Sequence, residues 1–317
     1  MYTIGIDLGG TNIAVGLCDK DLRIVEKASV RTNGHRPPDE IVKDMAAVSR
    51  SLIEKHGLTL SDIEYAGIAI PGAVVPERGM IEFTSNLPFV NYPITEKFRE
   101  LLPVDRVLIN NDANAAALGE ALAGAARGTQ SSIMITLGTG VGGGVILNGQ
   151  IFAGGMNSSG TELGHTVIVK GGRPCGCGRR GCWETYASAT GLTLSTKERI
   201  EELKANGKNS LMLTASKISG RTAFDAARRG DAEGKRLVDE YIDYLATGVT
   251  DMINIFQPEV LIIGGGISGE GDFLIKPLRD IVDADQYTKR NAVRTRIVAA
   301  TLGNDAGIIG AAGLGRK

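Results

Sequence analysis

One histidine and three cysteines lie close together near the middle of the sequence, and both residue types bind zinc. Cys175, Cys177 and Cys182 fall within eight residues, and His165 precedes the first of them by ten. Thiolate sulfur and imidazole nitrogen are the usual ligands of tetrahedral zinc, and four protein ligands make a closed, structural site. The spacing therefore predicts a structural zinc ion on these four residues. A Cys175–Cys182 disulfide or a chance cluster is the alternative, but one tight group of cysteines in a long chain is unlike a secreted disulfide scaffold.

Two segments place glycines and a threonine between predicted strands. The first is Asp7-Leu8-Gly9-Gly10-Thr11-Asn12 and the second is Leu137-Gly138-Thr139-Gly140. Glycine allows close approach of the backbone to a ligand, and the N–H groups of such a turn form a concavity that suits phosphate. Neither turn has the Gly-Lys-Ser/Thr of a P-loop or the strand-to-helix setting of a dinucleotide fingerprint. Together the two turns predict a binding site for a polyphosphate. The alternative is that both are only tight hairpins that bind no ligand.

Asp112 is the candidate for proton transfer. It follows a predicted strand (106–109) and Asn110-Asn111, and it opens an alanine-rich segment that favours a helix. Ligands of α/β sheets usually lie outside the carboxyl ends of the strands, which is where this aspartate would be. An aspartate in a first helical turn can also serve only to stabilise the helix dipole.

Strands and helices must position these residues. Hydrophobic patterning predicts a strand–turn–strand unit over 2–18, further strands over 22–30, 63–70, 166–169 and 260–263, and a helix that ends at Gly57. Residues 131–147 repeat the opening unit at an offset of 129 residues, which predicts two related hairpins. Segment 194–255 is mostly helical, and a short helix capped by Asn304 ends the chain.

Composition excludes several classes. The 317 residues are enough for two lobes with separate cores, and a net charge of −1 argues against a nucleic-acid binder. No apolar run approaches the roughly 18 to 20 residues of a membrane span. These features predict a cytoplasmic protein with no nucleic-acid or membrane partner.

The segment ELGHTVIVKGGRPCGCGRRGCWE closely resembles the signature of the ROK family of bacterial sugar kinases and repressors. The two turns, Asn111-Asp112 and Gly264-Gly265-Gly266 also resemble the phosphate and adenosine motifs of the actin, Hsp70 and hexokinase superfamily. Within the ROK family the chain looks most like the glucokinases of Gram-positive bacteria. The resemblance implies an α/β, two-lobed, actin/hexokinase-like (ribonuclease H-like) fold with a nucleotide cleft between the lobes. It places the N-terminal lobe at 1–115, completed by the helix at about 304–317, and the C-terminal lobe at 116–303, with the zinc loop at 162–184.

The resemblance also implies a role for each matching residue. Asp112 corresponds to the catalytic base that takes the proton of the attacking sugar hydroxyl. Sugar-binding positions correspond to Gly72, Asn86, Asn111, Asp112, Glu162, His165 and Glu184. ATP-binding positions correspond to Asp7, Gly9, Gly10, Thr11, Asn12, Gly138, Thr139, Gly140, Gly264, Gly265 and Gly266, with Asp7 near the Mg²⁺ that accompanies ATP. His165 would serve twice, with one ring nitrogen on zinc and the other toward the sugar.

The activity so implied is ATP-dependent phosphorylation of glucose to glucose 6-phosphate by a homodimer or homotetramer. Another hexose or N-acetylhexosamine is the alternative substrate: N-acetylmannosamine, N-acetylglucosamine, mannose, fructose or allose. A sugar-sensing repressor is the remaining alternative. Repressors of this family carry an added helix-turn-helix, for which the expected first strand at residue 2 leaves no room.

Overall fold

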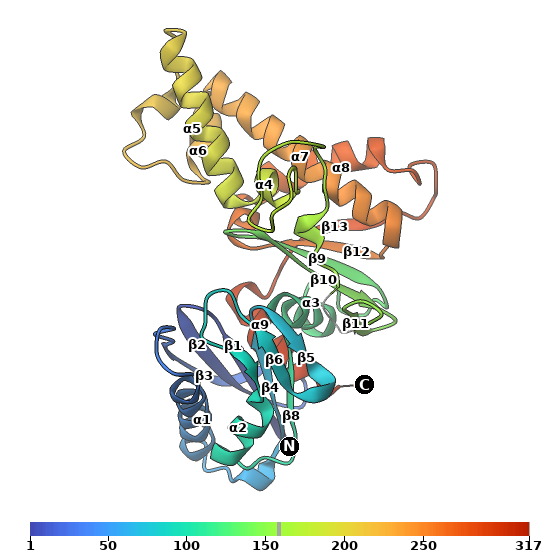
Figure 1. Cartoon of the computed structure of the whole chain (residues 1–317). Helices are drawn as coiled ribbons and strands as arrows, with labels where there is room; N and C mark the ends of the chain where they lie inside the picture. The colour runs from blue at the N-terminus through green and yellow to red at the C-terminus, as the bar shows by residue number, and fades with distance from the viewer. Residues whose placement is uncertain (157–159, 317) are drawn as a thin grey trace. The chain divides into compact units, whose positions relative to one another are not determined.

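The structure, a computed structural model, describes residues 1–156 and 160–316. The chain divides into two compact units (Figure 1). Unit 1 comprises Met1–Met134, Gly144–Thr161 and Thr301–Lys317, and unit 2 comprises Ile135–Gly143 and Glu162–Ala300. The lobe boundaries at 115 and 303 stay a prediction, and the last residue of the expected terminal helix, Lys317, lies outside the described residues.

Unit 1 is built on a five-stranded sheet in the order β3-β2-β1-β4-β8. These strands are β1 (Tyr2–Leu8), β2 (Asn12–Cys18), β3 (Ile24–Arg31), β4 (Ile63–Ile70) and β8 (Val107–Asn111). β1, β2 and β3 are antiparallel, and β4 joins β1 and β8 in parallel. The predicted opening hairpin and the strands after it are confirmed, and both parallel neighbours of β4 end beside candidate residues.

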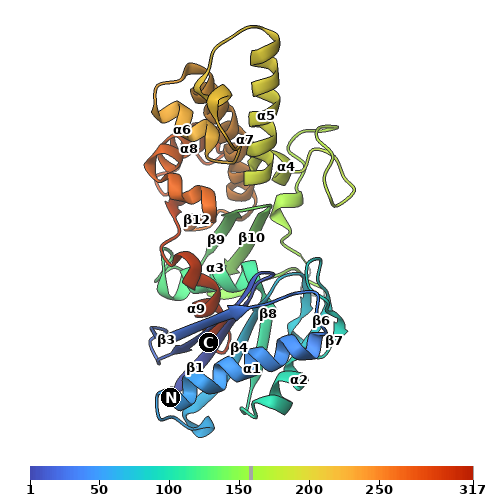
Figure 2. The ribbon, with the colours of Figure 1, turned by 90° about the vertical axis from the view of Figure 1, so that its left-hand side faces the viewer.

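Helices cover both faces of this sheet (Figure 2). On one face, Ile41 and Met45 of α1 (Pro38–Lys55) join the core that contains Ile4 and Ile6 of β1. On the other, α9 (Ala306–Gly313) lies so close that a Cβ on Gly5 would meet the Ile308 carbonyl oxygen at 2.1 Å. α3 (Asp112–Ala123) packs against α9, and α2 (Ile94–Leu101) packs against α1. A small sheet of β5 (Ala73–Val75), β6 (Met80–Phe83) and β7 (Val90–Tyr92) follows Gly72.

The terminal helix differs from its prediction. α9 begins at Ala306 with Asp305 as the preceding residue and no side-chain cap, and Asn304 lies inside a 3₁₀ turn, Gly303–Asp305. The prediction that Asn304 caps the helix is wrong, because the chain enters α9 from this turn. A capping side chain needs an extended backbone before the first helical turn.

The second sheet has the order β11-β10-β9-β12-β13. Its strands are β9 (Ser132–Leu137), β10 (Val141–Leu147), β11 (Gln150–Phe152), β12 (Val260–Gly264) and β13 (Arg296–Ala299). Numbered within each sheet, both orders read third, second, first, fourth, fifth. The short sequence repeat therefore marks the first hairpin of two sheets with one strand order.

The helices of unit 2 follow the zinc-loop segment in sequence: α4 (Glu184–Ala187), α5 (Ala189–Ala205), α6 (Thr222–Arg228), α7 (Ala232–Phe256) and α8 (Asp272–Asp285). The strand predicted over 166–169 is wrong. Only an isolated bridge joins Val167 to Cys182, because the N–H groups of Ile168 and Val169 both donate to the Gly181 carbonyl and leave no ladder to extend. Among the described residues, no helix is long and apolar enough to cross a bilayer.

Candidate active site and metal centre

In unit 1 the candidate acids lie at the carboxyl ends of two strands with one strand between them. Asp7 of β1 is in register with Ala69 of β4, and Ala69 is in register with Asn110 of β8. Asp112 follows two residues later as the first residue of α3. Adjacent strands are about 4.8 Å apart, so the backbones of Asp7 and Asn110 are separated by about 10 Å. The sheet therefore brings the two acids to one edge.

Asn111 fixes the start of the helix that carries Asp112. Its side-chain oxygen accepts hydrogen bonds from the N–H groups of Ala113 and Asn114, at 2.9 and 3.3 Å, so it is the N-cap of α3. Its amide nitrogen donates to the Gly72 carbonyl at 3.2 Å. Gly72 has φ +104°, and a Cβ there would lie 2.4 Å from the Phe83 carbonyl, so glycine is required. Gly72 thus orients Asn111 by its backbone.

Burial dominates the electrostatics of both acids. It raises the pKa of Asp112 above its usual range, against the lowering effect of hydrogen bonds from the Ala113 N–H and the Asn111 side chain. Burial, followed by repulsion from Asp112, raises the pKa of Asp7 to about 6. Asp7 also abuts α9, since a Cβ on Gly307 would lie 2.5 Å from its Oδ2. A carboxylate with a raised pKa is a better proton acceptor than a free aspartate.

The first glycine turn contains open space. Its Gly9 N–H donates to the Asn12 carbonyl at 2.9 Å, and the Thr32 hydroxyl donates to the Gly9 carbonyl at 2.7 Å. Gly10 does not have a positive φ, and a Cβ there would meet only the Cβ of Asn86, at 3.9 Å. Neither backbone strain nor packing demands glycine at position 10, which fits close approach of a ligand. Thr11 and Asn12 are exposed beside it.

In the second turn, the space beside Gly138 is open and the space beside Gly140 is filled by another side chain. Nothing lies within 4 Å of a Cβ built on Gly138, whereas a Cβ on Gly140 would lie 2.1 Å from Oε2 of Glu184. The same Oε2 accepts a hydrogen bond from the Val141 N–H at 3.1 Å. Thr139 is exposed at the tip. Glu184 was expected to bind the sugar. Its carboxylate therefore contacts the turn that was expected to bind the phosphates.

The glycines after β12 also differ in their roles. Gly264 is the last, buried residue of the strand. Gly265 has φ +82°, and a Cβ there would lie 2.5 Å from the Leu137 backbone, so this glycine is structural. Gly266 is exposed, and nothing lies within 4 Å of its Cβ position.

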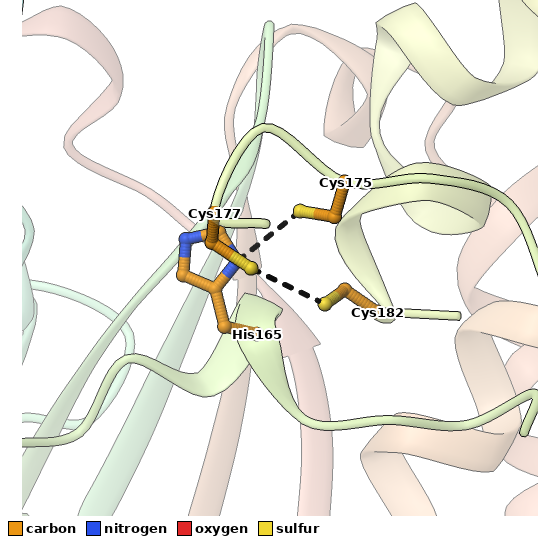
Figure 3. A group of neighbouring side chains, drawn as sticks. All are labelled: His165, Cys175, Cys177 and Cys182. Carbon is orange, nitrogen blue, oxygen red and sulfur yellow. Dashed lines mark hydrogen bonds between the residues drawn. The ribbon is translucent and has the colours of Figure 1, made fainter. Parts of the chain in front are cut away.

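The predicted zinc ligands converge (Figure 3). One donor atom from each of His165, Cys175, Cys177 and Cys182 lies within 4.8 Å of the others. His165 Nδ1 is 3.6 Å from Cys175 Sγ, and the sulfurs of Cys177 and Cys182 are 3.7 Å apart. A zinc tetrahedron with Zn–S of about 2.3 Å and Zn–N of about 2.0 Å puts its donors about 3.5 to 3.8 Å apart. The donor set and both spacings fit zinc. The cysteines are free thiols, so the disulfide alternative is not what the structure contains.

A metal ion bound by this cluster would displace protons from its thiols. Burial raises the pKa of the Cys182 thiol to about 12, whereas a hydrogen bond from the Arg179 N–H lowers the pKa of Cys177. Zinc binds thiolates, so its affinity here falls with falling pH.

This loop is held in place by three residues that the sequence patterns did not single out, Arg173, Trp183 and Tyr186. Trp183 is fully buried, donates from Nε1 to the Tyr244 carbonyl at 3.0 Å, and fills the space left by Gly248 of α7. Arg173 lies over the ring of Tyr186 at 5.0 Å and donates to Ser195 Oγ at 3.0 Å. The one tryptophan of the chain, directly between Cys182 and Glu184, was the available signal.

The candidate residues thus form two sets. Unit 1 brings together Asp7, Gly9, Gly10, Thr11, Asn12, Gly72, Asn86, Asn111 and Asp112. Unit 2 brings together the second turn, the Gly264–Gly266 segment, the four metal-ligand candidates and Glu184, whose Oε1 is 3.8 Å from Cys175 Sγ. Glu162 is exposed and immediately precedes the 3₁₀ turn Leu163–His165.

These sheets define the two-lobed, actin-like α/β fold of sugar kinases. The chain belongs to the ROK family, whose sequence profile matches residues 3–317. It is 38% identical to a glucokinase of Thermotoga maritima, over 98% of this chain and 96% of that protein. A glucokinase of Halalkalibacterium halodurans is 37% identical, over 98% and 93%. The crystal structure of a ROK family glucokinase from Streptomyces griseus in complex with glucose and AMPPNP covers 100% of this chain and 99% of its own, with a TM-score of 0.79 and 34% identity.

Proposed function

We propose that this protein transfers the γ-phosphate of ATP to the 6-hydroxyl of glucose, with Asp112 as the base. ATP-dependent phosphorylation of a sugar is the class of activity of the glucokinases to which the chain is similar along its whole length. The observation that carries the proposal is the placement of Asp112, a carboxylate of raised pKa at the start of a helix whose N-cap, Asn111, is tied to Gly72.

The base acts by orientation more than by strength. In the loose transition state of phosphoryl transfer, the attacking hydroxyl becomes acidic late. Asp112 accepts that proton and keeps the oxygen aimed at phosphorus, which lowers the entropic part of the barrier. One carboxylate oxygen accepts the Ala113 N–H at 2.8 Å, and we assign the role of proton acceptor to the other.

Sugar hydroxyls are bound by amide, carboxylate and imidazole groups. Asn111 donates its side-chain N–H groups to the Gly72 carbonyl and to Asp112, so its part in the sugar set is to hold the acid and the adjoining loop in place. The other residues that we assign to the sugar are Asn86 of unit 1 and Glu162, His165 and Glu184 of unit 2.

The two glycine turns bind the phosphates, and the glycines after β12 bind the adenosine. The open positions at Gly10, Gly138 and Gly266 support this assignment, because a side chain there would occupy space and not strain the fold. Mg²⁺ bound to ATP neutralises phosphate charge, and Asp7 is the carboxylate we assign to its hydration shell.

We assign a structural zinc ion to His165, Cys175, Cys177 and Cys182. These four residues would hold the ion, which would cross-link the loop and fix the ring of His165. His165 then presents Nε2 to the sugar in one tautomer. The metal acts as an anchor and activates no water.

We further propose that the enzyme works in the cytoplasm as a homodimer or homotetramer, which a measurement of native mass in solution tests. The deciding experiment for the activity is an ATP-coupled assay with glucose, mannose, fructose, allose, N-acetylglucosamine and N-acetylmannosamine. Glucose should give the highest kcat/KM. A higher value for an acetylated hexosamine would reassign the substrate, and no turnover with any sugar would refute the proposal.

A further inference from the structure

A fully buried carboxylate lies in α3 with no assigned role. Glu120 is 0% exposed, and among the ion pairs of the described residues none involves it. An unpaired buried charge is costly unless hydrogen bonds satisfy it. Such a group in a helix of alanines therefore calls for an explanation from its contacts.

Four hydrogen bonds satisfy this carboxylate. Oε1 accepts the N–H groups of Thr301 and Leu302, at 2.9 and 2.8 Å. Oε2 accepts the Ala125 N–H at 2.7 Å and the Thr301 hydroxyl at 3.1 Å. Every donor is neutral, so the group holds backbone positions and forms no ion pair.

The donors come from two places in the chain. Ala125 follows the end of α3, and Thr301 is the residue at which the chain enters unit 1 after leaving unit 2 at Ala300. Leu302 leads through the 3₁₀ turn into α9. Glu120 therefore ties the far end of α3 to the beginning of α9, and all of these atoms belong to unit 1.

Both candidate acids depend on these two helices. Asp112 is the first residue of α3, eight residues and about 12 Å along the axis from Glu120. Gly307, in the first turn of α9, abuts the carboxylate of Asp7. The helices meet backbone to backbone, since a Cβ on Gly310 would lie 1.7 Å from the Ala115 carbonyl. A shift of one helix is therefore passed to the other.

We infer that Glu120 is a positioning residue, which sets the register of α3 against α9 and through them the separation of Asp112 from Asp7. The consequence for phosphoryl transfer rests on the proposed function, while the clamp itself does not. The role belongs to the carboxylate with its two acceptor oxygens, because an amide cannot accept from donors on both of its sides.

Hydrogen exchange without substrate tests the clamp. In Glu120→Gln the amides of Ala125, Thr301 and Leu302 should exchange at least about tenfold faster, and so should that of Gly310 in the second turn of α9. Asp231→Asn is the matched control. Asp231 accepts the N–H groups of Leu211 and Gly234 in unit 2, and its loss should leave those unit 1 amides unchanged. Unaltered exchange at Gly310 in Glu120→Gln would overturn the inference.

Kinetics test the consequence. At a temperature where each variant is fully folded by circular dichroism, Glu120→Gln should lower kcat about tenfold or more, with KM for glucose within about threefold. Asp231→Asn should keep the wild-type kcat. Thr301→Val, which removes only the hydroxyl donor, should lower kcat two- to threefold and serves if Glu120→Gln does not fold. A wild-type kcat in a folded Glu120→Gln or Thr301→Val protein would contradict the positioning role of Glu120. If the wild-type protein itself were inactive, the proposed function would be contradicted, and the hydrogen-exchange result alone would decide whether Glu120 clamps the two helices.

Discussion

At the scale of single residues, the surroundings of Asp112 matter as much as its chemistry. Asn111 caps the helix, Gly72 holds Asn111, and burial raises the Asp112 pKa. The Asn-Asp pair and its place after a strand were predictable from sequence. The bond from Asn111 to Gly72 was not, because it joins residues 39 apart whose meeting depends on the β4–β8 pairing.

Asp112→Asn should therefore lower kcat by two to four orders of magnitude, the contribution usual for a general base, while KM for glucose changes little. The amide keeps the shape and cannot take the proton. Steady-state kinetics measure the loss, and Asp105→Asn, an exposed change before the same strand, is the control. A kcat within tenfold of wild type would mean that another group accepts the proton.

At the scale of elements, strand and helix patterns located most of the fold correctly because their apolar periodicity reflects burial on one face. The two failures have different physical causes. Segment 166–169 has the composition of a strand but no strand beside it, and Asn304 has the chemistry of a cap but the wrong backbone conformation. The first outcome is decided by contacts with Gly181, at least twelve residues away, and the second by the 3₁₀ turn through which the chain enters α9.

The second glycine turn supplies a matched pair of variants. Gly138→Ala should weaken nucleotide binding at least about tenfold, because the methyl group enters open space at the turn, and should change the free energy of unfolding by less than about 1 kcal/mol. Gly140→Ala should instead displace the Glu184 carboxylate and raise KM for the sugar. Calorimetric titration with an ATP analogue and sugar kinetics separate the two. Equal nucleotide affinity in wild type and Gly138→Ala would argue against a phosphate-binding turn.

The cysteine loop should depend on its metal. Cys182→Ala should abolish stoichiometric zinc, lower the melting temperature, and raise KM for the sugar, since His165 and Glu184 lose their anchor. Cys18→Ala, at a buried cysteine of unit 1 outside the cluster, should keep about one zinc per chain. Elemental analysis of fresh protein gives the ratio. Wild-type protein with well under one zinc per chain would count against the assigned site.

At the scale of the whole molecule, the buried acids make stability depend on pH. Asp7 has a pKa of about 6 in the folded protein against 3.8 for the free group, so the folded state holds its proton more tightly. The associated stability is fully present below pH 3.8 and is lost as the pH rises through 6. A shift of this size corresponds to about 3 kcal/mol at most.

Asp7→Asn should accordingly stabilise the ligand-free protein at pH 7.5, by up to about 3 kcal/mol, while it lowers activity. Between pH 4 and 7 the stability of wild type should fall more steeply than that of the variant. Urea unfolding at several pH values measures this difference, with Asp105→Asn as the exposed control. If the free energy of unfolding changed with pH in the same way for wild type and Asp7→Asn, Asp7 would have the same pKa in the folded and unfolded protein.

The place of α9 against β1 and β4 affects the order of assembly during synthesis. β1 to β8 are complete once residue 111 has been made, yet the helix that covers one face of that sheet ends at residue 313. A ribosome adding about 5 to 20 residues per second needs about 10 to 40 seconds for the interval. Throughout it the nascent sheet keeps an uncovered apolar face, so the third of the enzyme that is translated first is among the last parts to be completed. Chaperones have the most time to bind that face.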